Sequence, residues 1–374
     1  MKKIKIATVF SGIGSVEFAL KRLNVDHEIV FACDNGEVDI DIGDTMSILE
    51  DVKACETIED KKKYVDELYS SKTRKTNFVK ISYLANYDCP EERYFRDIRF
   101  LDGTDFEGKV DLFVGGSPCQ SFSYVGQRAG LDDARGTLFY EFARLINEIK
   151  PKVFIYENVR NLLNHDNGNT WKIINSIFEE LGYSISYDVL NASDFGIPQS
   201  RRRLFVVGYK NSRKKFNFPQ KMDLKFKAQN FLLDNCGIGN FKTNKFGDIS
   251  IAYSDGFSPE EYILSPKIYA YVMKGGTKSW YQKPEINLPI ARTLLKTMGN
   301  HHRAGVDNYY SSDGSNSFGK VRSLTERESL RFMGFTDDFK IAVSKAQTYK
   351  QAGNSIVVDV LMQILKNIFK DNVL

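Results

Sequence analysis

The sequence predicts an α/β protein in which helices cover both faces of a mostly parallel sheet, with a second, smaller and irregular domain. Three observations support this prediction. Apolar strands alternate with amphipathic helices up to residue 210, as expected of a parallel sheet with helical connections. The periodicity fades beyond that point, where Gly, Asn, Lys and aromatic residues are frequent. Helical periodicity returns near the end, so we expect the chain to leave the first domain and return to it.

The strands and helices of the first domain follow from the spacing of apolar residues. Residues 4–10 (IKIATVF) form an apolar run, and residues 15–23 carry apolar side chains at helical spacing. The other expected strands are 28–33, 110–116, 152–159, 183–190 and 203–209, and the other expected helices are 138–149, 171–181, 325–335 and 356–369.

These elements divide the 374-residue chain into parts. Residues 1–210 make up the first domain, residues 211–338 the small domain, and residues 339–374 the segment that returns. Residues of about 36–94 interrupt the first domain after its second expected strand. Helical spacing around residues 61–69 favours an inserted, partly helical segment.

The composition is that of a folded protein without membrane helices. Hydrophobic residues make up 42% and charged residues 27% of the chain. No apolar run approaches the roughly 18 residues of a membrane helix, and the basic start lacks a small-residue cleavage site. We therefore expect a cytoplasmic protein. The net charge is only +4, but the stretches 210–227 and 61–80 are basic, which indicates a polyanion partner or, for either alone, a solvated face.

The cysteines and histidines predict neither disulfides nor a metal site. The five cysteines are scattered and odd in number, without a CxxC pair. His301 and His302 are adjacent, so they lack the helical spacing that directs two ligands at one ion. We expect this histidine pair on a surface loop, and no metal.

The turn FSGIG after the first strand is a candidate cofactor site. Gly12 and Gly14 stand where a strand turns into a helix, and glycine lets the backbone approach a ligand closely. Asp34 ends the next expected strand, where a carboxylate can accept hydrogen bonds from ribose hydroxyls. Glu17 takes the place of the third glycine of a dinucleotide fingerprint and would repel a pyrophosphate. This disfavours NAD and FAD, and leaves a nucleoside cofactor without phosphates or a plain tight turn.

Further strand ends carry reactive side chains. Cys119 follows the apolar run LFVGG and Pro118, at the sheet edge where open α/β folds bind ligands. Glu157 ends the strand VFIYENV, and Arg201 and Arg203 precede another strand at alternate positions, so they point the same way. An inert buried cysteine and a surface charge run are the alternatives. The loop of Ser and Gly after Cys119 argues against the first, because such a loop can close over a ligand.

Several motifs follow one another in a specific order between residues 10 and 361. They are FSGIG, PCQSFS, RGTLF, ENV, QSRRR, ARTL and QAGNSIVVDVL. In this order they resemble the DNA (cytosine-5) methyltransferases of the bacterial restriction-modification type. The combination of PCQ, ENV, QxRxR and GNS is highly specific. The resemblance implies a Rossmann-like, S-adenosylmethionine-dependent methyltransferase fold, with a target recognition domain in the irregular part of the chain.

The resemblance also implies the catalytic residues. Cys119 would attack carbon 6 of cytosine, which makes carbon 5 nucleophilic toward the methyl group of S-adenosylmethionine. Glu157 would hold ring nitrogen 3 and the amino group, and Arg203 would contact the base carbonyl at position 2. Arg201 would support the loop and nearby backbone, and Asn158 would position the catalytic loop.

The cofactor-binding residues carry over from the same motifs. They are Phe10, Gly12, Gly14, Asp34, Asn35, Asp97, Ile98, Pro118, Leu138 and Asn354. Asp34 matches the ribose-binding acid, and Asp97 and Ile98 match the pair beside the adenine. Asn35 stands where the family often has a large hydrophobic residue, so we do not expect adenine stacking there.

The implied substrate is double-stranded DNA, from which the target cytosine must be flipped out. Residues 120–137 would close over the base, and residues of about 211–288 would neutralise phosphates and read bases. The insertion could cap the cofactor, touch DNA or decorate the surface, and we favour surface decoration. We expect a monomer without membrane contact, partnered with a restriction endonuclease that acts on the same site, although a solitary methyltransferase fits the sequence equally well.

Two other functions share part of this pattern. A transfer-RNA cytosine-5 methyltransferase resembles the DNA enzymes closely but typically carries a Cys-Phe-Thr signature, which this sequence lacks. A catalytically silent DNA-binding relative would have lost Cys119, Glu157 or the glycine turn, all of which are present. Both functions stay as alternatives at this point.

Overall fold

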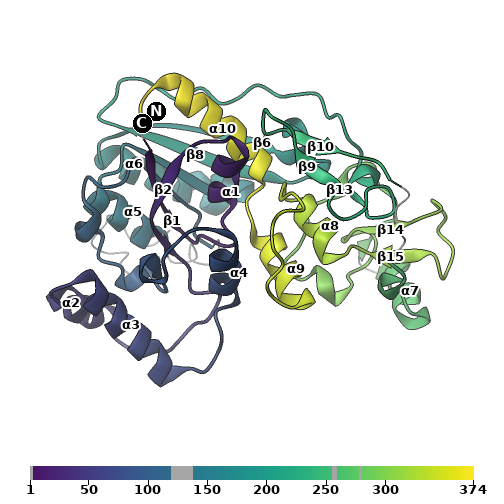
Figure 1. Ribbon diagram of the computed structural model, residues 1–374, viewed down its shortest axis with the longest axis horizontal. Helices are drawn as coiled ribbons and strands as arrows, with labels where there is room; N and C mark the ends of the chain where they lie inside the picture. The colour runs from purple at the N-terminus through teal and green to yellow at the C-terminus, as the bar shows by residue number, and fades with distance from the viewer. Residues whose placement is uncertain (1–2, 119–137, 255–258, 278–279) are drawn as a thin grey trace.

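The computed structural model describes residues 3–118, 138–254, 259–277 and 280–374. Within them, a seven-stranded sheet has the order β3-β2-β1-β4-β5-β8-β6 (Figure 1). All the strands expected for the first domain are present, and the two-residue β3 is an addition to them. The strands are β1 (Ile4–Val9), β2 (His27–Cys33), β3 (Tyr94–Phe95), β4 (Leu112–Gly115), β5 (Val153–Val159), β6 (Tyr183–Asn191) and β8 (Arg202–Lys210).

Most of the strand pairs are parallel. β1 pairs in parallel with β2 and β4, β2 with β3, and β4 with β5, whereas β8 is antiparallel to both β5 and β6. Val9 pairs with Cys33 and with Gly115, and Gly115 in turn pairs with Tyr156. The carboxyl ends of these four parallel strands therefore meet at one edge of the sheet, where open α/β folds bind ligands.

The sheet separates two hydrophobic layers, because alternate side chains of a strand point to opposite faces. Ile155 of β5 lies in the layer that contains α1 and α10, and its neighbours Phe154 and Tyr156 pack against α5 and α6. Helices thus cover both faces (Figure 1), and the predicted α/β architecture is confirmed. These helices are α1 (Ser15–Arg22), α5 (Leu138–Ile149), α6 (Asn169–Glu180) and α10 (Val358–Asp371).

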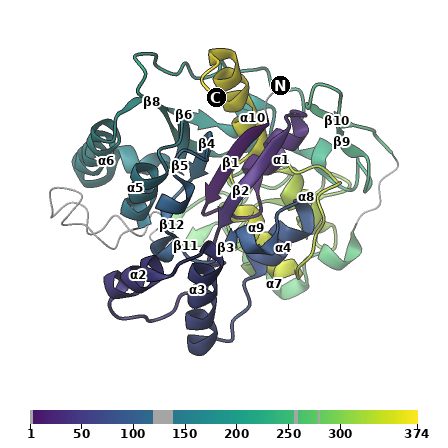
Figure 2. The ribbon, with the colours of Figure 1, turned by 60° about the vertical axis from the view of Figure 1, so that its left-hand side comes forward.

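The insertion contains three helices, whereas the sequence predicted helix only around residues 61–69. The side chains of Asp44, Thr57 and Asn77 each accept a hydrogen bond from a backbone N–H in the first turn and so begin these helices. α2 and α3 share a small core of their own, and α4 packs into the main core through Tyr83. Figure 2 shows α2 and α3 next to β3. The helices are α2 (Thr45–Ala54), α3 (Ile58–Lys72) and α4 (Phe78–Asn86).

The part of the chain after β8 has short ladders and short helices instead of a large sheet. A separate cluster forms around Leu264, Val272 and Val321, but Phe231 and Phe241 belong to the core shared with α1 and α10. The domain limits at residues 210 and 338 stay a prediction, and the hydrophobic core is continuous across the first of them. The elements are β9 (Phe241–Thr243), β10 (Ile249–Ile251), α7 (Pro266–Val272), β11 (Gly276–Thr277), β12 (Trp280–Tyr281), β13 (Ala291–Arg292), β14 (Tyr309–Ser311), β15 (Val321–Ser323), α8 (Glu326–Arg331) and α9 (Lys345–Asn354). β13 pairs with β7 (Gln199–Ser200), a short strand that precedes β8.

The end of the chain packs against the first domain. Arg22 of α1 binds Asp359 of α10 through both guanidinium amino groups, with N–O distances of 2.7 and 2.9 Å. The two side chains are only 2% and 10% exposed, so this buried pair fixes α10 on α1. None of the described helices is both long and apolar enough to cross a membrane.

Candidate active site

Glu157 and Arg203 form an ion pair at the carboxyl edge of β5. The antiparallel ladder pairs Glu157 with Phe205, and Arg203 Nε lies 3.2 Å from Glu157 Oε1. A Cβ on Gly116 would lie 2.7 Å from the backbone oxygen of Glu157, so the close approach of the two strand ends requires glycine. Burial raises the pKa of Glu157, and the charges of Arg203 and Arg201 oppose this effect. A carboxyl group that holds its proton more readily can donate a hydrogen bond as well as accept one.

Arg201 is buried and bonds to the backbone of two distant segments. Its Nη1 donates to the carbonyl oxygen of Leu294 at 3.1 Å, and its Nη2 donates to those of Gly353 and Ser355 at 3.0 and 2.9 Å. Burial lowers the pKa of Arg201 to about 9, which still leaves the guanidinium charged at neutral pH. Arg201 is therefore no part of a surface charge run, and its contacts fit the expected supporting role.

Asn158 fixes the segment that follows β4. Its Nδ2 donates to the carbonyl oxygen of Ser117 at 2.9 Å and to Tyr156 Oη at 2.8 Å. Ser117 Oγ lies 2.8 Å from the same tyrosine hydroxyl, so the three side chains form one buried network. This network holds the backbone two residues before the predicted nucleophile.

Cys119 and residues 120–137 lie outside the described residues, so the predicted nucleophile and lid are not placed. The residues on either side are described. Pro118 is exposed, and Leu138 is the half-buried first residue of α5.

A cavity at the carboxyl edge of β1 and β4 contains part of the predicted cofactor site. Phe10, Gly12 and Asn354 all line it, together with Gly115 and the segment that joins β1 to α1. Gly12 has a φ of +54°, and a Cβ there would meet nothing closer than the carbonyl oxygen of Phe10 at 4.0 Å. The backbone at Gly12 is therefore open to a ligand.

Gly14 has a different surrounding from Gly12 and is not among the residues that line this cavity. A Cβ on Gly14 would lie 2.1 Å from the ring of Tyr87, and the φ of Gly14 is +79°. In the described structure, glycine at this position is required by the packing of the insertion on the turn. Gly14 therefore has a packing role in the described structure, and its place in the cofactor site stays a prediction.

Asp34 lies beside the glycine turn, as expected of a residue at the end of β2. Its Oδ2 accepts a hydrogen bond from the Gly12 N–H at 2.9 Å and its Oδ1 accepts one from the Gly36 N–H at 2.7 Å. Burial raises the pKa of Asp34, and these two bonds oppose the rise. The side chain of Asn35 bonds to a nearby residue, since its Nδ2 donates to Asp39 Oδ1 at 3.1 Å. It offers no ring or large apolar group on which an adenine could stack.

Asp97 and Ile98 follow β3, so they reach the same sheet edge. Both are buried, at 5% and 4% exposure. The Asp97 carboxylate accepts hydrogen bonds from Tyr69 Oη at 2.6 Å and from the guanidinium of Arg99, also at 2.6 Å. These contacts engage both carboxylate oxygens, because the Arg99 N–H also donates to Oδ1 at 3.0 Å. Asp97 is therefore firmly oriented by its neighbours.

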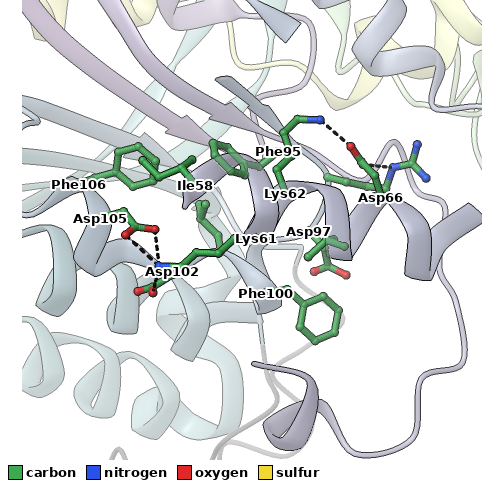
Figure 3. Close-up of a pocket in the computed structure, with 13 residues that line it drawn as sticks. Ile58, Lys61, Lys62, Asp66, Phe95, Asp97, Phe100, Asp102, Asp105 and Phe106 are labelled. Atoms are coloured by element: carbon green, nitrogen blue, oxygen red, sulfur yellow. Dashed lines mark hydrogen bonds and ion pairs between the residues drawn. The ribbon is translucent and has the colours of Figure 1, made fainter. Parts of the chain in front are cut away.

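The space between α3 and the segment after β3 is too small for a ligand. Its free volume is about 10 Å³, which is room for about one water molecule. Lys61 of α3 reaches Asp102 and Asp105 there at 2.8 and 2.9 Å (Figure 3). This contact joins the insertion to the first domain by an ion-pair cluster in which Lys61 and Asp102 are buried.

Glu17 does not face the glycine turn as the sequence had suggested. The residue is fully buried, and its Oε1 accepts hydrogen bonds from Thr8 Oγ1 at 2.9 Å and Tyr83 Oη at 2.7 Å. Burial raises its pKa, which favours the neutral acid. Repulsion of a phosphate by Glu17 is therefore the wrong argument, because the carboxyl group is turned into the core.

Sequence reasoning missed Glu37, which joins Asn354 to two basic residues. Glu37 Oε1 accepts hydrogen bonds from Asn354 Nδ2 at 2.9 Å and Lys296 Nζ at 3.0 Å, and Oε2 pairs with Lys350 Nζ at 2.5 Å. Partial burial raises the pKa of Glu37, but these bonds outweigh burial and lower the pKa below its usual value. No spacing in the sequence could have identified this residue, because its partners lie at the other end of the chain.

A basic groove of about 530 Å³ opens at the sheet edge where β5 and β6 end and β8 begins. Arg160 follows β5, Arg202 begins β8 and Asn191 ends β6, so they lie at the same edge of the sheet. The groove is therefore continuous in the fold with the elements that carry the ion pair.

Comparison with known proteins adds to this geometry. Residues 56–370 match the model of a family described as C-5 cytosine-specific DNA methylase. The chain is 35% identical to the Type II methyltransferase M.SsoII of Shigella sonnei over 309 residues, 81% of this chain and 74% of that protein. It is 36% identical to M.HhaI of Haemophilus parahaemolyticus, over 69% of this chain and 75% of that protein.

Solved structures share the fold at lower sequence identity. The crystal structure of S. pombe Dnmt2 methyltransferase aligns with a TM-score of 0.65 and 16% identity, over 99% of each chain. A DNA modification methyltransferase encoded within a prophage in E. coli aligns with a TM-score of 0.60 and 19% identity, over 98% of this chain and 99% of that chain. These likenesses confirm the predicted fold.

Proposed function

Because the chain belongs to the C-5 cytosine-specific DNA methylase family and transfers a methyl group to carbon 5 of cytosine in DNA, we propose that the transfer proceeds through a covalent adduct with Cys119. The observation that carries the proposal is the Glu157–Arg203 pair. It lies at the sheet edge to which residues 116–118 lead, with side chains 14% and 19% exposed. A base bound against this pair would lie next to the segment that carries the thiol.

The glycine turn fits a methyl donor of the S-adenosylmethionine type. The open backbone at Gly12 lets a ligand approach the turn beside Phe10 and Asn354, and Asp34 stands at the neighbouring strand end. When bound there, S-adenosylmethionine supplies an electrophilic methyl group. Asp34 would accept hydrogen bonds from the ribose hydroxyls with the lone pairs that the backbone N–H groups leave free.

Cys119 begins the proposed reaction. Its thiolate forms a bond to carbon 6 of the cytosine, and the electron pair of the 5,6 double bond forms the new bond between carbon 5 and the methyl group. The bond between that methyl group and the sulfonium sulfur of the donor would break in the same step, and the neutral thioether S-adenosylhomocysteine would leave. Carbon 5 then loses its proton to a base. The electrons of that C–H bond restore the double bond as the bond from carbon 6 to sulfur breaks, which regenerates the thiolate.

Glu157 and Arg203 act on the ring during the addition. Addition of sulfur places negative charge on the ring, and a protonated Glu157 donates a hydrogen bond to ring nitrogen 3 to stabilise it. The raised pKa of Glu157 supports this role. Arg203 contacts the carbonyl at position 2, while Arg201 and Asn158 hold the backbone around the site.

The basic groove takes the DNA backbone in this proposal. Arg160, Arg202 and Lys221 line it, and each can neutralise a phosphate. The target cytosine leaves the helix to reach Glu157, at a cost of roughly a few kcal/mol. Residues of about 211–288 supply the base-reading contacts.

Replacement of Cys119 tests the mechanism. Cys119→Ala should abolish transfer of labelled methyl groups to duplex DNA and leave cofactor binding unchanged. The matched control is Cys55→Ala, a half-buried cysteine at the end of α2, which should keep full activity. Wild-type turnover in Cys119→Ala would refute the covalent step.

A second assay separates this function from the alternatives. DNA with 5-fluorocytosine in the target site should trap the wild-type protein covalently, because fluorine cannot leave carbon 5 as a proton does. Label that enters transfer RNA but not DNA would favour the RNA enzyme. Cofactor-dependent DNA binding without methylation or trapping would favour the silent relative.

We further propose that the protein is the modification enzyme of a restriction-modification system, since the Type II relatives are about 35% identical to it. It would act as a cytoplasmic monomer on a site that a cognate restriction endonuclease also recognises. Bisulfite-type sequencing of DNA from cells that express it would reveal the site. Resistance of this DNA to an endonuclease encoded beside the methyltransferase gene would separate a role in restriction-modification from that of a solitary methyltransferase.

A further inference from the structure

We propose that the insertion, residues 36–94, positions the cofactor site. Three of its polar side chains each hydrogen-bond to the segment that follows one of three neighbouring strands. Tyr87 bonds after β1, Asn77 after β2 and Tyr69 after β3. This inference rests on the proposed function, which places the cofactor at these strand ends. Surface decoration, the role that the sequence favoured, is the wrong description of α4 and of the inner face of α3.

Tyr87, at the end of α4, holds the glycine turn after β1. Its hydroxyl donates to the carbonyl oxygen of Gly14 at 2.6 Å and lies 3.0 Å from that of Ile13. The ring lies so close to Gly14 that a Cβ there would be 2.1 Å from it. The turn that opens Gly12 to a ligand therefore takes its shape partly from the insertion.

Asn77 holds the end of β2 in the same way. Its Nδ2 donates to the carbonyl oxygen of Asp34 at 2.7 Å, while its Oδ1 accepts from the Lys80 N–H at 2.9 Å and so begins α4. A Cβ on Gly36 would lie 2.3 Å from this Oδ1. One buried amide thus couples the start of α4 to the backbone of the ribose-binding candidate.

Tyr69 of α3 holds the residue after β3. It is fully buried, and its hydroxyl donates to Asp97 Oδ2 at 2.6 Å. Arg99 approaches the same carboxylate, so tyrosine and arginine together fix its orientation. The ion pairs of Lys61 with Asp102 and Asp105 dock the same helix beside this segment (Figure 3).

The three contacts lie at the carboxyl ends of three adjacent parallel strands. Loops at the carboxyl ends of adjacent parallel strands form the binding crevice of open α/β folds, and affinity falls when such loops must be ordered on binding. Loss of an insertion hydroxyl should therefore weaken cofactor binding. The groove residues that we assign to DNA lie around β5, β6 and β8, so DNA binding should change little.

Tyr69→Phe and Tyr87→Phe test this inference, because each removes one hydroxyl and keeps the ring. The control is Tyr64→Phe, on the same helix as Tyr69, whose hydroxyl donates at 3.0 Å to Asp51 of α2, away from the site. Calorimetry would give the Kd for S-adenosylmethionine, and steady-state assays the KM values for cofactor and DNA. Thermal unfolding without ligand would report the cost to folding.

We expect each test variant to bind S-adenosylmethionine roughly tenfold more weakly, with an unchanged KM for DNA and with Tyr64→Phe like the wild type. Cofactor affinity within about twofold of the wild type in both variants would overturn the inference, whatever the change in thermal stability. It would leave the proposed function intact, because the wild type would still bind and use the cofactor. A wild-type protein that binds no S-adenosylmethionine would instead refute the proposed function.

Discussion

Asp307 should make the protein less stable as the pH rises. It is 4% exposed, and burial raises its pKa from 3.8 to about 7, against a hydrogen bond from the Asn308 N–H and the charge of Arg292. Because the folded-state pKa lies above the unfolded value, the folded protein holds the proton more tightly. The stability from this group is complete below pH about 4 and is lost as the pH rises through about 7.

The magnitude follows from the two pKa values. A rise from 3.8 to about 7 corresponds to about 4 kcal/mol, at about 1.4 kcal/mol for each tenfold change in proton affinity. Slightly less than half of this stability is already lost at pH 5, so about 2 to 3 kcal/mol should disappear between pH 5 and pH 8. Asp307→Asn should remove this loss of stability, because the amide cannot ionise. Its oxygen can still accept the hydrogen bond from the Asn308 N–H, which is 2.9 Å long in the wild type.

Urea unfolding at pH 5 and pH 8, followed by circular dichroism, would measure the effect. We expect Asp307→Asn to be more stable than the wild type by about 4 kcal/mol at pH 8 and by about half of that at pH 5. Asp313→Asn, an exposed aspartate of the same region, is the control and should keep the pH dependence of the wild type. If the wild type and Asp307→Asn lose stability in parallel between the two pH values, burial of this carboxylate is not the cause.

Two further substitutions test the assigned site. Asp34→Ala should weaken cofactor binding at least tenfold before it affects DNA binding, measured by calorimetry and by gel shift, and an unchanged cofactor affinity would contradict its role. Arg201→Met removes the donors to three backbone carbonyls beside Asn354, so the KM for the cofactor should rise and turnover should fall, each by roughly tenfold. Arg202→Met, at the exposed neighbouring position, is the control and should change only the KM for DNA. If the two arginine variants raised the KM for the cofactor equally, Arg201 would have no positioning role.

The sheet and its reactive edge could be predicted because strands buried on both faces are continuous apolar runs. In β5 every residue from Val153 to Tyr156 is buried, and the run ends where Glu157 and Asn158 reach the edge. A polar residue that directly follows such a run in the sequence is therefore expected at the edge of the sheet. The contacts of Arg201 could not be predicted in this way, because its partners lie 93 to 154 positions away in the sequence.

β3 and α9 are among the elements that were missed, and each escaped prediction for a different physical reason. β3 has two residues and is too short for any periodicity to show. α9 buries Thr348, Tyr349, Gln351, Ala352 and Gly353, a face of small and polar side chains that carries no apolar pattern. Helix and strand signals depend on apolar spacing, so elements that pack by hydrogen bonds or by close backbone approach escape them.

The cofactor side of the site shows most clearly where motif reasoning ends. The motifs place Gly12, Asp34 and Asn354 near one another, but Glu37 bonds to Asn354 across 317 positions and to Lys296 across 259. These bonds join the insertion to the recognition part and to the returning end of the chain. A motif fixes which groups stand at a strand end, whereas tertiary contacts of this kind fix their spacing and orientation. Differences in cofactor affinity between this chain and a relative with the same motifs should therefore arise in the insertion, where the supporting side chains lie.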